Sequence, residues 1–398
     1  MKSVKPPAAG NIALLATLDT KGAEVAFLKE LIQKQGFGTV VIDVGTGKAV
    51  GPSSDIPREE VARASGGEPS RRGELRRDEL MELMGRGAGA ILKRLLEGGN
   101  LRGVLGLGGN QGTAIASIAM RGLPLGFPKL LVSTVASGNM RPYIGTKDIT
   151  AMFSVADLMG GVNTVSRAIL SNAAAAITGM AARGEPLSYS GARPRVAATS
   201  FGNTEPAVAR ARELLQERGY EVIAFHASGA CGSAMEELIE EGLFGGVLDL
   251  TTHELLGEVL GLDIYQPVRK GRLTAAGRKG IPQVVAPGGL DYYCFGGAET
   301  IPPELRGRKT HYHNPYNTNV RASAEELKLV GKELARRLNE ARGPTAFLFP
   351  LRGWTENGRE GGPLSDPEAD RALLKSLRES LRPEVSLMEV DSNLNDPP

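Results

Sequence analysis

The chain has 398 residues, of which 47 are Lys or Arg and 45 are Asp or Glu, so its formal net charge is +2. This near balance excludes a general electrostatic attraction to nucleic acid or to an anionic membrane, and we expect neither partner. The length allows two or three domains, and the presence of only two cysteines excludes a disulfide framework.

The same composition bears on cellular location. The charged first residues are not followed by the apolar core of a signal peptide. The alanine-rich run at 168–182 is too short and too polar to span a bilayer. We therefore expect a cytoplasmic protein. Its 52 glycines exceed the usual share of about 7% and indicate many tight turns.

The first part of the chain predicts a strand–helix–strand unit. Apolar periodicity indicates, in order, a strand over 12–17, a loop over 18–22, a helix over 23–35 and a strand over 39–44. The charged segment at 53–78 is rich in Gly, Pro, Ser and Arg, so we expect an exposed excursion there.

The most informative stretch is an apolar strand at 103–107 that runs into a glycine turn and then into a helix. The turn consists of Gly108, Gly109, Asn110, Gln111, Gly112 and Thr113. Backbone N–H groups are unpaired at a helix N-terminus, and residues without Cβ atoms let an anion approach them closely. We expect a positive φ at Gly109. The alternative is a tight turn without a ligand, which is common in α/β proteins.

Three further loops follow predicted strands at the same edge of the sheet. They contain Asp19, Thr20 and Lys21, then residues 45–48 with Thr46, and then residues 133–138 with Ser137 and Gly138. Ligands of open parallel sheets bind beyond the carboxyl ends of the strands. Hydroxyls, glycine amides and lysines gathered there suit a polyanion such as a nucleotide triphosphate.

The second half repeats the plan of the first. Residues 196–227 again predict strand, loop, helix and strand, in the pattern of residues 12–44. Strand–helix alternation with short apolar strands predicts parallel sheets covered on both faces. The fold class is therefore α/β, with two Rossmann-like domains related by internal duplication. We place the domains at 1–182 and 195–398, with a linker at 183–194.

The residues alone leave the kind of nucleotide open. The spacing of Gly106, Gly108 and Gly112 resembles a dinucleotide fingerprint, but the next strand ends in Ser133 and Thr134 instead of an acid that would bind a ribose. No P-loop is present either, because residues 47–48 are followed by an alanine. Motif and spacing thus predict only a phosphate-bearing ligand.

A resemblance goes further than these motifs. The segments that carry it lie at 16–21, 41–44, 103–113, 132–138, 143–148, 171–174, 225–227, 246–252, 288–291, 301–304 and 350–353. Together they resemble the ATP-binding family typified by the tomato protein that inhibits tomato mosaic virus RNA replication, whose bacterial members are catalogued as uncharacterised. The resemblance covers nearly the whole chain. It implies two Rossmann-like domains, ATP bound in the first, and homodimers.

The resemblance also implies particular nucleotide contacts. They fall on Asp19, Thr20, Lys21, Thr46, Arg86, Gly87 and Ala88, and the glycine turn completes the pocket. Each has a plainer alternative. Lys21 is otherwise an exposed lysine at a helix start, and Arg86 otherwise lies on a solvated helix face. Asp19 could bind a Mg²⁺–nucleotide through water or only cap a helix.

A second candidate site lies in the second half, where all four histidines occur. Its candidate residues are His226, His253, Asp291, His311, His313 and Arg352. With Asp249 and Glu254 nearby, these groups could supply imidazole and carboxylate to a metal or act as general bases. The histidine spacing matches no standard zinc motif, so metal use stays open.

These features favour a protein that binds ATP in the first domain and acts on or senses a small polar metabolite in a second cleft. One alternative is a nucleotide-gated protein-interaction module without catalysis. The other is an NAD(P)-dependent oxidoreductase that uses residues 106–112. No residue has a clear role as a catalytic base, so whether the protein is an enzyme stays open.

Overall fold

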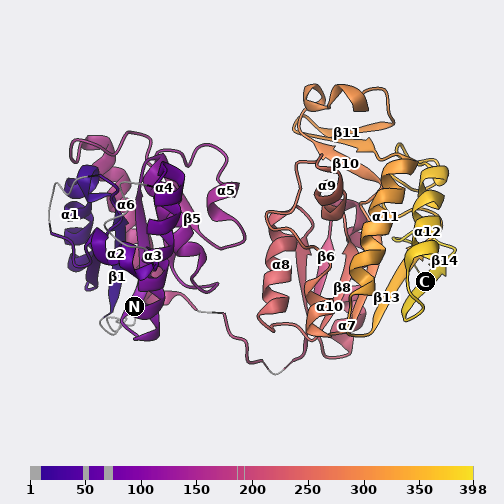
Figure 1. The fold of residues 1–398 in the computed structure, drawn as a ribbon, viewed down its shortest axis with the longest axis horizontal. Helices are drawn as coiled ribbons and strands as arrows, with labels where there is room; N and C mark the ends of the chain where they lie inside the picture. The colour runs from indigo at the N-terminus through magenta and orange to yellow at the C-terminus, as the bar shows by residue number, and fades with distance from the viewer. Residues whose placement is uncertain (1–9, 48–52, 67–74, 186, 192, 398) are drawn as a thin grey trace, which may run out of the picture. The chain divides into compact units, whose positions relative to one another are not determined.

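The computed structural model describes residues 10–47, 53–66, 75–185, 187–191 and 193–397. The chain divides into two compact units, Met1–Ser188 and Tyr189–Pro398 (Figure 1). The described residues between 183 and 194 are all exposed. No helix in the described part of the chain has the length and apolarity needed to cross a membrane.

The first unit is built on five parallel strands. They are β1 (Asn11–Ala16), β2 (Gly38–Asp43), β3 (Leu101–Gly108), β4 (Lys129–Ser133) and β5 (Thr150–Phe153), in the spatial order β2-β1-β3-β4-β5. The order reverses between β1 and β3. In doubly wound sheets this switch point is where ligands bind, because the loops after the two strands diverge there.

Helices cover both faces of this sheet. They are α1 (Leu18–Lys34), α2 (Arg58–Ala64), α3 (Arg77–Glu97), α4 (Asn110–Arg121), α5 (Arg141–Ile144) and α6 (Thr164–Arg183). Alternate residues of β1 enter two different cores. Leu14 lies with α1 and α6, whereas Leu15 lies with α2, α3 and α4. Burial on both faces explains why the strands are continuous apolar runs.

The second unit repeats this order and extends it. Its six parallel strands are β6 (Arg195–Ser200), β7 (Glu221–His226), β8 (Gly246–Thr251), β9 (Gln283–Gly288), β13 (Thr345–Pro350) and β14 (Val385–Val390), ordered β14-β13-β9-β8-β6-β7. The order reverses between β6 and β8, the counterparts of β1 and β3. The predicted fold class, two α/β domains with parallel sheets, is confirmed.

Helices again pack on the two faces of the second sheet. They are α7 (Glu205–Glu217), α8 (Ala230–Glu240), α9 (Glu254–Leu260), α10 (Ala275–Lys279), α11 (Ala324–Asn339) and α12 (Pro367–Ser380). Val208 of α7 packs with Ala198 and Ala286 of the sheet. Phe347 of β13 packs on the opposite core with α9, α11 and α12.

An antiparallel sheet that the sequence analysis did not predict is inserted between β9 and α11. Its strands are β10 (Tyr292–Phe295), β11 (Thr310–Asn314) and β12 (Asn317–Arg321), in the order β10-β12-β11. Tyr293 and Val320 enter the large core, so Cys294 and Asn319, which pair with each other, occupy the opposite face. Figure 1 shows this sheet at one end of the parallel sheet, near α9.

Two local expectations about the first unit are wrong. Residues 18–20 form the first turn of α1 and not a loop, because Leu18 is buried in the core; only Lys21 leaves helical geometry, with φ −120° and ψ 15°. The segment at 53–78 is only partly exposed, since Ile56 bridges to Ile42 and α2 buries Val61. Residues 67–74 of that segment lie outside the described residues.

Candidate functional site

The glycine turn after β3 lies at the switch point of the first unit. Gly109 is the N-cap of α4, and no side chain caps this helix. The Thr113 N–H bonds to the Gly109 carbonyl, as in a regular helix. The N–H groups of residues 110–112 have no carbonyl partner within the helix, because a helix leaves its first donors unpaired.

The glycines of this turn have different roles. Gly109 has φ −79° and ψ −158°, so the expected positive φ is wrong. A Cβ added at Gly109 would meet only the Thr134 hydroxyl, at 3.6 Å. A Cβ at Gly108 would lie 2.6 Å from the Gly112 Cα. Gly108 is therefore required by the close approach of strand and helix, whereas the space at Gly109 is open.

Side chains from three loops meet around this turn. Gln111 Nε2 donates to Thr46 Oγ1 at 2.5 Å, and Gln111 Oε1 accepts from Arg77 Nη2 at 3.0 Å. The Thr113 and Ser133 hydroxyls lie 2.6 Å apart. The structure thus brings Thr46 and Gln111 together, and it places the buried Thr113 hydroxyl against Ser133. It adds Arg77, which the sequence analysis missed because it stands at the start of α3 without a motif.

Lys21 and Asp19 follow the neighbouring strand, since Ala16 of β1 pairs with Leu107 of β3. Lys21 is 8% exposed, and in the described part of the chain its ammonium has no hydrogen-bond or ion-pair partner. Asp19 Oδ2 accepts from the Gly47 N–H at 3.1 Å. Thr20 is exposed, next to both.

A buried ion pair organises the loops after β1 and β2. Asp43, at the end of β2, accepts from Arg58 Nε at 2.7 Å, from the Gly45 N–H at 2.9 Å and from the Leu18 N–H at 3.2 Å. Both charged side chains are buried. Because three segments bond to one carboxylate, Asp43 holds the edge loops in place.

The remaining predicted nucleotide contacts lie along α3 or in the loop after β4. Arg86 is exposed midway along α3 and lies 4.0 Å from Glu82. A Cβ at Gly87 would lie 1.9 Å from the Val61 carbonyl oxygen, and Ala88 is fully buried in the core. Ser137 and Gly138 are exposed in the loop after β4. At the turn itself, the guanidinium that the structure places beside Gln111 is that of Arg77.

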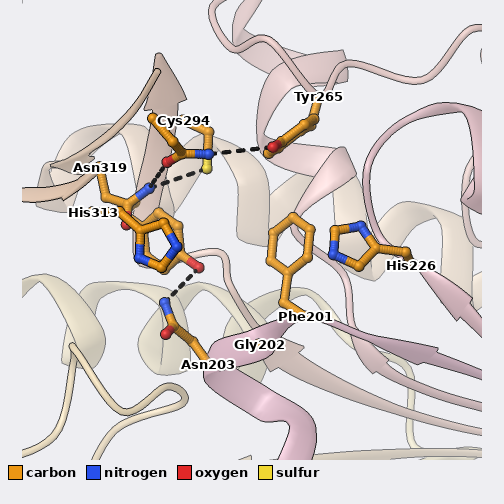
Figure 2. Close-up of a pocket in the computed structure, with 10 residues that line it drawn as sticks. Phe201, Gly202, Asn203, His226, Tyr265, Cys294, His313 and Asn319 are labelled. Atoms are coloured by element: carbon orange, nitrogen blue, oxygen red, sulfur yellow. Dashed lines mark hydrogen bonds between the residues drawn. The ribbon is translucent and has the colours of Figure 1, made fainter. Parts of the chain in front are cut away.

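The second unit has a cavity of about 130 Å³ at the carboxyl edge of its parallel sheet. Its lining residues come from the β6 and β7 loops, from the segment after α9 and from the antiparallel sheet: Phe201, Gly202, Asn203, His226, Tyr265, Tyr292, Cys294, His313, Asn317 and Asn319 (Figure 2). The antiparallel sheet thus covers the switch point between β6 and β8. This volume is well below the roughly 300–1,000 Å³ of pockets for drug-sized ligands.

Amides and phenols form one wall of the cavity. Asn319 Nδ2 donates to Asn317 Oδ1 at 3.0 Å and to Cys294 Sγ at 3.3 Å, and Asn317 Nδ2 donates to the Tyr265 hydroxyl at 3.2 Å. Asn203 Nδ2 donates to the Tyr292 hydroxyl at 3.1 Å. Figure 2 shows these contacts converging around the cavity. The wall is polar and fixed by its own hydrogen bonds, which suits a small polar ligand.

Only some of the predicted second-site residues line the cavity. His226 and His313 line the cavity, and the ring of Phe201 lies between His226 and the fully buried His253, at centroid distances of 4.9 and 4.8 Å. His311 neighbours His313 on β11 but does not line the cavity. Arg352 is exposed and paired with Asp391 at 2.7 Å, so it lies outside the site.

The acidic residues near the histidines lie next to buried arginine side chains. Arg272 bonds Asp249 through two nitrogens, at 3.0 and 3.1 Å, and also bonds Glu236 and Glu254. Asp291 accepts from the Thr355 hydroxyl at 2.6 Å and lies 4.0 Å from Arg321. Burial raises the pKa of the Asp291 carboxyl. Asp249 and Glu254 are therefore structural.

Burial and neighbouring charge shift the pKa values of His226 and His253 in opposite directions. Burial and the nearby His253 lower the pKa of His226. Burial opposes charge on His253, but the Asp263 carboxylate raises the pKa of that ring well above its ordinary value. Burial also raises the pKa of the Cys294 thiol. At neutral pH His226 thus offers a neutral imidazole to the cavity.

Most of the cavity wall carries no recognisable motif in the sequence. Tyr292, Cys294, Asn317 and Asn319 come from the antiparallel sheet, and Tyr265 follows α9. The available signal was alternation: polar residues two apart face one side of a strand. Four- and five-residue strands are too short for that signal to stand out.

Taken together, two doubly wound sheets with polar groups at their switch points define a two-domain α/β protein of the Rossmann-like class. The chain belongs to the uncharacterised protein family UPF0261: the N-terminal domain model of that family matches residues 10–186, and its C-terminal domain model matches residues 193–398.

Relatives align along the whole length of the chain. A UPF0261 protein of Clostridium tetani is 44% identical over 388 residues, which are 97% of this chain and 95% of that protein. The ToMV resistance protein Tm-1(GCR237) of Solanum lycopersicum is 36% identical, and the match covers 92% of this chain but 51% of that protein.

Among solved structures, the glycosyltransferase SsfS6 of Streptomyces sp. SF2575 matches 70% of this chain and 82% of its own, at 16% identity and a TM-score of 0.18. That similarity is too low to carry an argument.

Proposed function

We propose that the N-terminal domain binds a nucleotide, with ATP as the first candidate, and that its phosphates lie against the N-terminus of α4. The observation that carries the proposal is the pairing of open helix donors with a buried cation at one switch point. The uncapped N–H groups follow β3, and the Lys21 ammonium follows the adjacent β1. Helix N-termini and lysine both favour phosphate.

The space at Gly109 supports the same proposal. A phosphate needs the position that a side chain would fill, and here only the Thr134 hydroxyl lies within contact distance of it. Arg77, held by Gln111, provides a second cation at the rim. Asp19, with one oxygen bonded to the Gly47 N–H, is the carboxylate that could hold a Mg²⁺–nucleotide through water.

In the same proposal, the C-terminal cavity takes a small polar metabolite, because 130 Å³ is too little for a nucleotide and the wall is rich in amide, phenol and imidazole groups. The nearly balanced charge and the two free cysteines support a cytoplasmic location. The family resemblance supports homodimers.

The proposal is tested by a thermal-shift screen of nucleotides with and without Mg²⁺. A ligand that binds only the native state raises the melting temperature, by an amount that grows with its concentration relative to its Kd. We expect ATP to stabilise the protein more than NAD⁺ or NADPH does. If a dinucleotide raises the melting temperature and ATP does not, the oxidoreductase alternative replaces this assignment.

An ATPase assay on the same protein separates an enzyme from a binding module. Hydrolysis well above background, lost in a variant that no longer binds ATP, excludes the nucleotide-gated interaction module. Binding without turnover favours that module.

A further inference from the structure

Three buried side chains from separate segments meet behind the wall of the C-terminal cavity. His253 follows β8, Asp263 follows α9 and Cys294 belongs to β10. One imidazole nitrogen, one carboxylate oxygen and the sulfur all lie within 4.8 Å of one another. The Asp263 and His253 side chains are 1% and 0% exposed. Cys294 also lines the cavity, so the cluster borders the space where a ligand can enter.

The hydrogen bond of His253 determines which of its nitrogens faces the cluster. Nδ1 lies 2.7 Å from the Gly289 carbonyl oxygen, which can only accept, so Nδ1 carries the hydrogen. Nε2 then faces Asp263 Oδ2, at 3.1 Å: it pairs with that carboxylate while the ring is protonated, and its lone pair becomes available to a metal once that proton leaves. Nε2 is fully buried and makes no hydrogen bond of acceptable geometry with any described residue. A carbonyl that orients an imidazole in this way is a common second shell of metal-bound histidine.

Gly289 is part of this arrangement. Its φ is +76°, and a Cβ on it would lie 2.9 Å from the His253 Cβ. A residue with a side chain would push the ring away from the carbonyl. The glycine therefore permits the contact that aims Nε2 at the carboxylate and the sulfur.

The other two donors are also held by hydrogen bonds. Asp263 Oδ1 accepts from the Tyr265 N–H and Oδ2 from the Cys294 N–H, both at 2.6 Å. Asp263 has a φ of 140°, which is rare outside glycine. Cys294 Sγ accepts from Asn319 Nδ2 at 3.3 Å, a contact that stabilises charge on the sulfur. Tyr265 and Asn319, which hold Asp263 Oδ1 and Cys294 Sγ, lie outside the cluster, whereas Asp263 Oδ2 is held by the backbone N–H of Cys294.

We propose that His253, Asp263 and Cys294 form a Zn²⁺ site with a fourth position open to the C-terminal cavity. A nitrogen, a sulfur and an oxygen ligand suit Zn²⁺, whereas Mg²⁺ and Ca²⁺ prefer oxygen ligands alone. Zinc bonds of about 2.0–2.3 Å place tetrahedral ligands about 3.3–3.8 Å apart, so a small contraction of the present cluster completes the site. Three protein ligands with one open position are typical of zinc that binds a water or a substrate atom.

The site goes beyond nucleotide binding, since it lies in the other domain and requires no phosphate. It also defines the ligand class of the cavity. A small molecule with an oxygen or nitrogen donor could take the fourth position while the Asn317 and Asn319 amides and the Tyr292 hydroxyl contact its polar groups. The rival arrangement is an ion pair between a protonated His253 and Asp263, with Cys294 as a bystander thiol.

The test uses the full chain without a histidine tag, reduced and stripped of metal with a chelator. Wild-type protein is titrated with Zn²⁺ against a chromophoric chelator, and with Co²⁺ while its absorption spectrum is followed. We expect one Zn²⁺ per chain, and a thiolate-to-Co²⁺ charge-transfer band in the near ultraviolet. Failure of wild-type protein to bind Zn²⁺ stoichiometrically overturns the proposal, whatever the variants do.

The chain offers a matched control because its only other cysteine, Cys231, is exposed on α8. Cys294→Ser should remove the charge-transfer band, and Cys231→Ser should retain it at full intensity. Asp263→Asn should weaken Zn²⁺ binding at least tenfold. Circular dichroism of each variant checks its fold. A band that persists in C294S, or that disappears in C231S, places the metal elsewhere and refutes the site. Neither result affects ATP stabilisation, which reports on the other domain.

Discussion

Lys21 is a buried lysine in the first turns of α1, and its ammonium has no partner in the described part of the chain. We expect Lys21→Ala to weaken ATP binding by about 1.5–3 kcal/mol, the value of a hydrogen bond to a charged group. This corresponds to an increase in Kd of about 10- to 150-fold. Isothermal titration calorimetry measures the change.

Lys34→Ala is the matched control for this variant. Lys34 lies at the far end of the same helix, exposed and paired with Glu30. The Lys34→Ala variant should bind ATP with the affinity of the parent protein. If Lys21→Ala also binds like the parent, the ammonium plays no part in binding and the phosphates lie elsewhere.

Gly109 and Gly108 differ in a way that separates binding from folding. Valine at Gly109 meets open space and a negative φ that does not require glycine, so the free protein should keep its melting temperature but lose ATP binding. Valine at Gly108 meets the Gly112 backbone and should lower the melting temperature with or without ATP. Melting curves and ATP affinity of both variants check this. A Gly109→Val protein that binds ATP normally removes the turn from the site.

At the scale of elements, periodic segments were predicted well and short ones were not. The strands around residues 12–17 and 103–107 are long apolar runs buried on both faces, so hydrophobicity alone identifies them. The strands β10 to β12 are short and alternate between core and cavity. Their pairing depends on contacts distant in sequence, and the cavity wall that they form could not be predicted from local pattern.

In the candidate sites too, residues that follow a predicted strand could be identified from the sequence, whereas residues placed by contacts distant in sequence could not. Thr46 and Gln111 were predicted because both follow strands of one sheet, and the common edge brings them together. Asp263 was not predicted, because its place beside His253 and Cys294 depends on how a loop returns across the sheet. Asp249 and Glu254 were candidate metal ligands, but both form buried ion pairs with Arg272. Arg272 stands later in the chain without any motif, so the sequence did not indicate these ion pairs.

Arg272 joins several elements through one buried guanidinium. It bonds carboxylates from α8, β8 and α9, and all four side chains are buried. Removal of one partner from a buried ionic group typically costs about 3–5 kcal/mol, because uncompensated charge stays behind. We expect Arg272→Met to lose stability of that size in urea unfolding. The loss of unfolding free energy should be smaller at low pH. There the three carboxyl groups around Arg272 are protonated and neutral, so removal of the guanidinium leaves no uncompensated charge.

Arg352→Met is the comparison for this variant. Arg352 pairs with Asp391 at the surface, where such pairs contribute about 0–1 kcal/mol. Equal stabilities of the two variants would show that the buried cluster is dispensable.

At the scale of the whole molecule, one plan produces two different sites. Both sheets reverse their order at the first and third strands of the unit, so each has a ligand position at that point. In the first unit β4 leads to α5 and β5, and the edge at Gly109 is open. In the second unit the antiparallel sheet follows β9 and encloses a small cavity. The insertion thus accounts for the difference between an open edge in the first unit and a small enclosed cavity in the second.

The two units also have separate hydrophobic cores. Every described core cluster belongs wholly to residues before 188 or wholly to residues after 189, and the described linker residues are exposed. Each unit should therefore fold alone, because domains with their own cores are independent in that respect. We expect the fragment 1–188 to unfold cooperatively and to keep the ATP-induced rise in melting temperature, while 189–398 shows none. An ATP response that only the full chain gives would mean that the nucleotide needs residues of both domains, and the site proposed here would then be incomplete.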